Sequence, residues 1–460
     1  MRTLRTLLCL LMAALLPVSA LAEELVLFCH SWRSDEEIAS FQEAFPDVTV
    51  RTNLDDGQGV DFNQVLLDFV SRNYVWDLFK LPFSTGEARR LGDRGYLSDL
   101  NQNAIIRETM KQLPAGIRQS VTNAKGEVFA LPCELSTQHP LMAFNMEVAG
   151  ALGIEKPRTY AELFQLLEDW EYDYADQADK EGYSLTDVAP FELSPRRFLA
   201  RMVDDYISIY ADGRLISYAT PEFTALMRTF DRYRDTLGEI SEAVPENQTI
   251  RRKNALILTD YPLLLDYDMA MEYEGIFEPM FLSITDDPDD AVIAVDMKAL
   301  SVSAGAPRLD LAIAYAEHLS SSLDDANRIL LQGGSDDTPV EWEHYATTRQ
   351  DYLDWIAEAE EALGDAEEED ASQLTELIGS WREEFESIEA RRYTYTAESI
   401  RRYAALAPRL RPMPSVSYQY YCDQQNTNYL LSAFELGNIP VDQFIREFDH
   451  VQSMMNLEDQ

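Results

Sequence analysis

The feature that most constrains the fold is a strand–helix–strand pattern near the start of the chain. "ELVLFC" (24–29) has the apolar pattern of a buried strand, "SDEEIASFQEAF" (34–45) that of an amphipathic helix, and "DVTVRTNL" (47–54) alternates like a strand. The pattern continues with a helix over 60–72, a strand over 76–82 and a helix over 87–94. Strands and helices that alternate with short joints form parallel βαβ units, so we expect a doubly wound α/β sheet.

The sequence pattern changes after Asn145, where longer amphipathic helical patterns predominate. They cover 159–170, 196–210 and 220–237, and Thr159 and Thr220 stand where residues that cap helices are favoured. The strand pattern "NALILTDY" (254–261) interrupts them and stops at a proline. With 460 residues, the chain exceeds one ordinary core. We therefore expect a second lobe with its own small sheet, and a return to the first lobe in the strand pattern over 291–304.

The stretch "GEVFALPCELSTQHPLMAFN" (126–145) joins the two patterns. It holds two apolar runs separated by a polar run that begins at Pro132. Proline cannot donate a hydrogen bond to a sheet, so one continuous central strand is disfavoured. We expect the chain to leave the first sheet at Pro132 and to cross back near Pro288. The expected divisions are first lobe 23–135, second lobe 136–287, first-lobe return 288–335 and second-lobe completion 336–460.

Residues 345–390 differ in kind from the rest. Two helical patterns flank the acidic segment "GDAEEEDAS" (364–372), which indicates an acidic helical hairpin. Its apolar residues recur at heptad-like spacing and are expected to form the seam of the pair; a partner-docking face is the alternative. Thr396 is expected to cap the helix that follows. The seam residues are Tyr352, Ile356, Ala359, Leu363, Leu374, Ile378, Trp381, Phe385 and Ile388.

Residues 1–22 have the layout of a secretory signal peptide. Arg2 and Arg5 precede an apolar run that ends in the small-residue triplet 20–22, so cleavage is expected after about Ala22. The residues before Cys9 do not form a lipoprotein cleavage box. No later segment is apolar for long enough to span a membrane. The mature protein is therefore expected to be exported, to the periplasm or the outer face of the cell membrane.

Charge and cysteine usage exclude several classes of function. The net charge is −43, so binding to nucleic acid or an anionic membrane surface is disfavoured. Cys29, Cys133 and Cys422 remain after cleavage; they allow one internal disulfide at most, and three buried thiols are the alternative. The five histidines show no metal-ligand spacing. We expect neither a metal nor a cofactor.

The order of these segments resembles that of the family 1 extracellular solute-binding proteins, the binding components of sugar-type ABC importers, with a layout like that of maltose-binding proteins. The resemblance covers nearly all of the mature chain. It rests on short signals in the expected order: "FQEAFPDVTV", "WDLFKLPFSTGEARRLGDRGYLSDL", "NAKGEVFALP" followed by "LMAFN", "KPRTYAEL", "SYATPEFTALM", "LAIAYAEHLSSS" and "LGNIPVDQFIREFD". The acidic hairpin is longer than in the compact maltose-binding members.

The resemblance implies a two-lobed α/β fold of the type II periplasmic-binding-protein layout, with the acidic hairpin inserted. It also implies a monomer that binds a small solute, most often a carbohydrate, by hinge closure and delivers it to the transmembrane permease of an ABC importer. In open α/β sheets, ligands bind beyond the carboxyl ends of the strands. Residues at such ends and in the crossing are the candidate ligand-binding residues: Trp32, Lys80, Phe83, Ser84, Glu134, Ser136, Thr137, Asp260, Tyr261, Tyr418, Tyr420 and Tyr421.

Each candidate has a structural alternative. Trp32 is equally explained by packing, the tyrosines of 418–421 by a sealed lobe interface, and Lys80 by pairing with a neighbouring acid. Asp77 and Asn145 are expected to be structural caps. An enzyme is the rival class, because 81 acidic residues could supply a glycosidase pair. No nucleophile, zinc or phosphate-binding motif supports catalysis, so we expect no enzyme. A sensor that signals to a receptor kinase is the other alternative.

Overall fold

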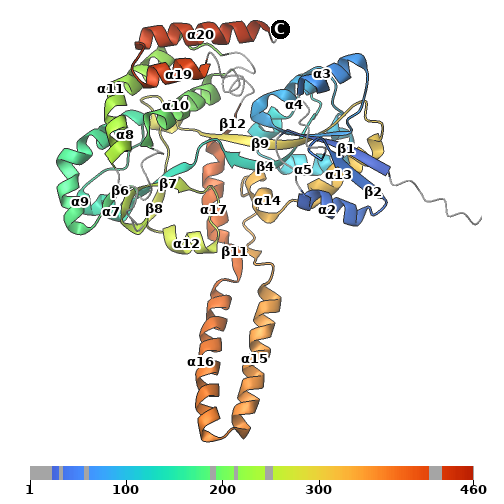
Figure 1. The fold of residues 1–460 in the computed structure, drawn as a ribbon, viewed down its shortest axis with the longest axis vertical. Helices are drawn as coiled ribbons and strands as arrows, with labels where there is room; N and C mark the ends of the chain where they lie inside the picture. The colour runs from blue at the N-terminus through green and yellow to red at the C-terminus, as the bar shows by residue number, and fades with distance from the viewer. Residues whose placement is uncertain are drawn as a thin grey trace, which may run out of the picture.

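The computed structural model describes residues 23–30, 35–55, 62–186, 193–211, 216–243, 252–413 and 427–458. These residues form two main β-sheets, the helices that cover them, and a long pair of helices that projects from the body (Figure 1). None of the described helices is long and apolar enough to cross a membrane. The predicted signal peptide lies outside the described residues.

The first sheet is built on a parallel βαβ unit, as predicted. β1 lies between β2 and β3 and is parallel to both. β9 is antiparallel to β3 on one edge and to β4 on the other, and β12 extends the sheet beside the start of β9. The strands are β1 (Glu23–Cys29), β2 (Val48–Thr52), β3 (Leu78–Pro82), β4 (Leu131–Thr137), β9 (Ile293–Val302) and β12 (Leu410–Pro412).

The second sheet has the order β6-β7-β5-β8. β5 is antiparallel to both β7 and β8, and β6 is parallel to β7. The strands are β5 (Leu141–Asn145), β6 (Ser184–Thr186), β7 (Ala255–Tyr261) and β8 (Phe277–Met280). The predicted second, smaller sheet is therefore present.

Helices cover both sheets (Figure 1). Around the first sheet are α2 (Asp35–Ala44), α3 (Phe62–Ser71), α4 (Glu87–Asp93), α5 (Ala104–Gln112), α6 (Ala115–Ser120), α13 (Leu309–Ser321) and α14 (Asp325–Leu331). Around the second are α7 (Met146–Leu152), α8 (Tyr160–Asp169), α9 (Ala175–Glu181), α10 (Pro195–Tyr210), α11 (Pro221–Ala243), α12 (Tyr267–Tyr273), α19 (Thr427–Glu435) and α20 (Val441–Glu458). α17 (Ala397–Leu406) stands between the two groups (Figure 1).

Two apolar cores follow from the alternation of side chains along the strands. In β5, Phe144 packs into a core shared with α8, α10, α11 and α20, whereas its neighbour Ala143 faces the opposite way. That opposite face belongs to the same continuous core as the first sheet. Ile400 and Tyr403 of α17 lie in this continuous core and are fully buried. α17 therefore packs where the two halves of the molecule meet.

Asp77 joins several elements of the first half. Its carboxylate is fully buried. Oδ2 accepts a hydrogen bond from the Val26 backbone N–H at 2.9 Å, and Oδ1 accepts one from the Arg308 N–H at 3.1 Å. The Arg308 guanidinium pairs with Oδ2 at 2.9 Å. The predicted structural role of this residue is confirmed, because it links β1, the start of β3 and the start of α13.

We expect Asp77→Ala to lower the free energy of unfolding by about 2–3 kcal/mol, because two buried or half-buried N–H groups and a guanidinium would lose their acceptor. Since the side chain of Arg308 is 34% exposed, water recovers part of the loss. Urea unfolding monitored by circular dichroism measures the change. Glu108→Ala, which breaks the exposed pair with Lys111, is the control and should leave the midpoint unchanged. An equal midpoint for both variants would contradict the assigned role.

The crossing between the sheets lies later than predicted. Pro132 does not end the first sheet: β4 contains it and continues to Thr137, paired with β9 throughout. A β-bulge between Pro132 and Glu134 inserts Cys133, and β4 pairs with no second strand among those described. Proline is tolerated at bulges and on edge strands because no ladder hydrogen bond is lost there. The chain crosses to the second sheet between Thr137 and Leu141, and it returns between β8 and β9, near Pro288 as predicted.

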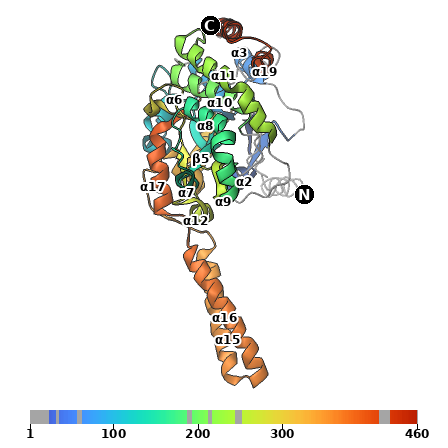
Figure 2. The same cartoon turned by 90° about the vertical axis from the view of Figure 1, so that its left-hand side faces the viewer.

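The helical pair projects far from the body, as both views show (Figures 1 and 2). It consists of α15 (Tyr345–Asp365) and α16 (Glu368–Ala390), and the short antiparallel strands β10 (Val340–Glu341) and β11 (Tyr393–Tyr395) close its base. Ala359, Ile378 and Ile388 of the predicted seam are buried. Trp355 and Leu377 remain 43% and 40% exposed, so the pair shields only part of its apolar surface.

Candidate functional site

One face of the first sheet gathers charged side chains near the crossing. Glu134 of β4 lies opposite Lys298 of β9, and Ser136 lies opposite Asp296. Lys80 of β3 lies opposite Leu300, two residues beyond Lys298. Residues that lie opposite one another, and every second residue along a strand, share a face. These charged side chains therefore lie on the same face of the sheet. A face that only packed against an apolar core would not carry them.

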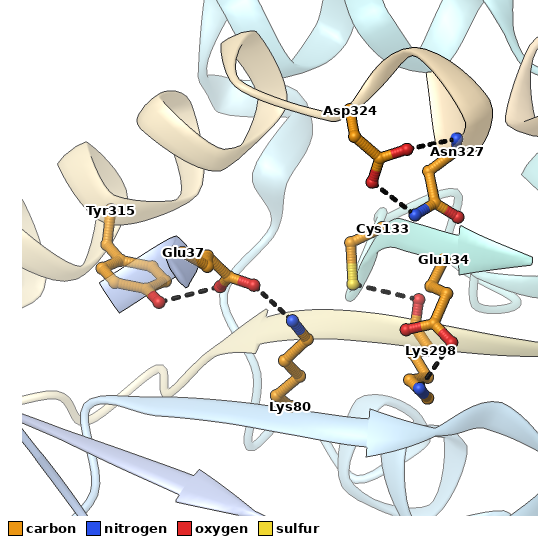
Figure 3. Close-up of polar contacts among 8 residues, drawn as sticks. All are labelled: Glu37, Lys80, Cys133, Glu134, Lys298, Tyr315, Asp324 and Asn327. Atoms are coloured by element: carbon orange, nitrogen blue, oxygen red, sulfur yellow. Dashed lines mark hydrogen bonds and ion pairs between the residues drawn. The ribbon is translucent and has the colours of Figure 1, made fainter. Parts of the chain in front are cut away.

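Lys80 is held by an acid from α2 (Figure 3). Its ammonium group pairs with Glu37, and the Tyr315 hydroxyl donates to the other oxygen of Glu37 at 2.8 Å. The side chains of Lys80 and Glu37 are 6% and 12% exposed. Burial alone lowers the pKa of Lys80, but the charge and the hydrogen bond of Glu37 oppose this, and the pKa is raised. At neutral pH the lysine is therefore charged and fixed in place.

A second pair lies beside the first (Figure 3). Glu134 accepts a hydrogen bond from the Lys298 ammonium at 2.5 Å, and both side chains are about one-third exposed. The thiol of Cys133 donates to the Lys298 carbonyl at 3.3 Å. Burial raises the pKa of Cys133 to about 12, so it remains a protonated thiol. Glu134 and Lys298, unlike Lys80, are accessible enough to exchange their partners for a ligand.

Lys80, Cys133 and Glu134 line a cavity of about 620 Å³, which we call the sheet-face cavity. Acidic residues Asp35, Glu36 and Glu37 from the start of α2 form one wall. Asp324, at the start of α14, forms another and is bonded to Asn327 at 2.8 and 2.7 Å (Figure 3). The volume lies within the range of small-molecule sites. Carboxylates, the Asn327 amide and the Lys80 ammonium group together offer both acceptors and donors.

Asp296 links the end of β3 to the crossing strands. Its Oδ1 accepts the Ser84 backbone N–H at 3.0 Å. Burial raises the pKa of Asp296, and the N–H groups of Ser84 and Met297 oppose that rise. Ser136 is exposed and Thr137 is half-buried on the same stretch of β4. The segment that follows β3 is thus hydrogen-bonded to β9, the strand that returns from the second half and pairs with β4.

The structure brings together part of the predicted site. Lys80 and Glu134 line the sheet-face cavity, and the predicted alternative for Lys80, pairing with an acid, is also realised. Ser84, Ser136 and Thr137 lie on or beside strands β3 and β4, which contribute to it. Asp260 stands apart on β7, exposed and paired with Arg252 at 3.1 Å.

Two predicted aromatic contacts are not supported. Phe83 is 3% exposed and stacks against Phe129 with ring centroids 6.4 Å apart. Tyr261 is 3% exposed and packs near Tyr273 in the same core. Phe83 directly follows β3 and Tyr261 is the last residue of β7, and both rings are buried in the core, so neither presents a face to a ligand. Trp32, Tyr418, Tyr420 and Tyr421 lie outside the described residues.

Sequence reasoning missed Glu37 in the lining of the cavity and three residues outside that lining, Asp296, Lys298 and Tyr315. Lys298 and Asp296 alternate in "IAVDMKALSV", which is the signal of a polar stripe on one strand face. Glu37 is one of three consecutive acids at the start of α2, and the sequence does not distinguish it from the other two. Tyr315 had no local signal, because it lies 278 residues from its partner.

The described residues hold no group of three or more histidine, cysteine or acidic side chains that could bind a metal ion. Cys29 and Cys133 are buried and form no disulfide with a described residue, and Cys422 lies outside the described residues.

Neither a protein-family model nor a curated protein matches the sequence. Solved structures do match its fold. MsmE from Bacillus subtilis subsp. subtilis str. 168, in an open conformation, is 12% identical over 96% of this chain and 99% of its own, with a TM-score of 0.57. Maltose-bound MalE3 of T. maritima is 12% identical over 94% and 100%, with a TM-score of 0.50. An ABC transporter solute-binding protein from Agrobacterium radiobacter K84, in complex with ribitol, is 13% identical over 94% and 98%, with a TM-score of 0.50.

The chain thus has the two-lobed α/β fold of ABC transporter solute-binding proteins, and the predicted fold class is confirmed. The match extends over nearly the full length of each of these structures.

Proposed function

We propose that this protein binds a small solute outside the cytoplasm, a sugar or oligosaccharide, and delivers it to the permease of an ABC importer. The observation that carries the proposal is the sheet-face cavity, which lies beside a strand that crosses between two sheets in this fold. Glu134 belongs both to the cavity and to the crossing strand β4. A ligand held there contacts the element about which the halves would bend.

The chemistry of the cavity suits a polyhydroxylated ligand. Sugar hydroxyls both donate and accept hydrogen bonds, and they need partners once water is excluded. Asp35, Glu36 and Glu134 in the lining accept, the Asn327 amide donates, and Lys298, which pairs with Glu134, is a further donor beside the lining. Each group left without a partner would cost about 1–3 kcal/mol, so a ligand with matched hydroxyls is favoured over one without.

Binding is proposed to close the hinge. Closure brings the second half over the ligand, and the closed form presents both halves to the permease. Export by the signal peptide, cleavage after about Ala22, action as a monomer and the permease partner are parts of the same proposal. The fold and the sequence support them jointly.

The test is isothermal titration calorimetry of the mature protein against maltose, malto-oligosaccharides, raffinose, ribitol and mannitol. We expect saturable 1:1 binding of at least one, and a smaller radius of gyration by X-ray scattering when it is bound. A ligand at about 100 times its Kd adds roughly 2.7 kcal/mol of stability, which a thermal-shift assay detects. Appearance of shorter sugars during incubation would overturn the proposal in favour of a glycan-degrading enzyme, and absence of binding across the panel would overturn the ligand class.

A further inference from the structure

A second cavity lies at the base of the helical pair, away from the sheet-face cavity. It has a volume of about 440 Å³ and is lined by the start of α12, both hairpin helices and the strands that close the hairpin; we call it the hairpin-base cavity. Arg391, just after α16, pairs with Asp268 of α12 at 3.4 Å. The cavity is therefore bounded by two structural units that a salt bridge already holds together.

Aromatic rings form much of its lining. They are Tyr267 from α12, Trp342 from beside β10, Tyr352 from α15 and Tyr393 from β11. Each of the four is partly exposed rather than buried in a core. Four rings from four different elements line one cavity, and the Arg392 guanidinium already lies over the Tyr393 ring at 5.1 Å, which leaves Tyr267, Trp342 and Tyr352 for a ligand. The face of such a ring attracts a positive charge.

The charged lining is predominantly acidic. Asp266, Asp268 and Glu384 contribute carboxylates, and Arg391 contributes the cationic group that pairs with Asp268. Among the described residues, Asp266 and Glu384 have no cationic side chain as a partner. Asp266 also accepts the Met269 N–H at 2.8 Å as the cap of α12, which fixes its carboxylate. Two carboxylates thus remain available to a ligand.

The acidic residues around the hairpin-base cavity also favour a cationic ligand. Residues 345–390 hold 15 acidic residues and two arginines, a net charge of −13. A surface of one sign concentrates ions of the opposite sign near a concave site. Neutral ligands gain nothing from such a field, and anions are repelled by it.

We propose that the hairpin-base cavity is a binding site for a small organic cation of the alkylammonium class. The ammonium group lies against the aromatic faces and is neutralised by Asp266 and Glu384. This inference does not rest on the proposed sugar site, because the two cavities share no residue.

The experiment is calorimetric titration of the mature protein with choline and, separately, with putrescine, at about 0.15 M salt so that long-range attraction is screened. We expect saturable 1:1 binding of at least one of them. Asp266→Asn/Glu384→Gln should weaken it at least tenfold, and asparagine preserves the helix cap. Trp342→Leu should weaken it as well, because an apolar side chain replaces the ring without its cation-binding face. Circular dichroism confirms that each variant is folded.

The control variant Glu358→Gln/Glu376→Gln removes two exposed hairpin charges outside the cavity. It should change the affinity less than twofold. Equal weakening in both double variants would show diffuse attraction to the acidic hairpin and overturn the proposal. So would the absence of saturable binding by either amine, or saturable binding of maltose that Trp342→Leu abolishes.

Discussion

Replacing Lys80 by methionine is expected to lower the free energy of unfolding by about 3–5 kcal/mol, because the carboxylate of Glu37 would remain in the interior without its cation. Glu37 is 12% exposed and is also fixed by Tyr315, so it cannot turn out to water without breaking a second contact. Urea unfolding measures the loss. Replacing Lys111, whose pair with Glu108 is exposed, should have no measurable effect.

The double variant Glu37→Gln/Lys80→Met separates stability from binding. It removes both charges together, and the glutamine carbonyl can still accept from Tyr315, so most of the lost stability should return. Its affinity for the sugar identified by calorimetry should nevertheless fall about tenfold, since both residues line the sheet-face cavity and their fixed charges help to orient a ligand there. Recovery of both stability and affinity would show that the pair is purely structural. Failure to recover stability would contradict the buried-pair explanation.

A pH-dependent stability difference of about 3–4 kcal/mol is expected from Asp205 on α10. Tyr160 donates a hydrogen bond to it at 2.6 Å, and burial raises its pKa to about 7. In the unfolded chain the pKa is about 4. Between these values the folded state binds the proton more tightly, so stability decreases as the pH rises from about 4 to about 7 and levels off above.

The matched variant is Asp205→Asn, which does not titrate and retains an acceptor for Tyr160. The difference in unfolding free energy between wild type and variant, measured from pH 4 to pH 8, isolates this group from the others in its surroundings. These are Arg201 and Asp204 on the same helix, and His139, which pairs with Asp204 at 2.8 Å. A constant difference across the range would show that the carboxyl group is not buried in solution as it is in the structure.

Local patterns predicted the elements of this fold well, because they depend on neighbours in the sequence. Thr159, Thr220 and Thr396 accept hydrogen bonds from the N–H three residues later, as expected of helix caps. Asn145 caps α7 in the same manner, as predicted. The two-sheet arrangement followed from the change of pattern after Asn145. The periodicity of apolar residues was sufficient to predict these elements, because one face of each strand or helix is buried and the other is more exposed.

Contacts between distant segments were beyond such reasoning. The sequence predicts a crossing at Pro132 because proline cannot donate a hydrogen bond to a central strand pairing. β4 has a bulge at this position and, among the described strands, pairs on one side only, so no backbone N–H is needed from Pro132. Phe83 directly follows β3 and Tyr261 is the last residue of β7, yet both side chains pack into the core. The partner of Lys80 comes from a helix 43 residues earlier, and no spacing rule selects Glu37 over its acidic neighbours.

Because the helical pair is long, a small rotation at its base moves its far end over a large distance. A helix of 23 residues is about 35 Å long, so turning the base by about 10° carries the far end through roughly 6 Å. Of the two strands at the base of the pair, β11 leads directly into α17, which packs where the two halves meet. The tip would thus report, at a distance, on the angle between them.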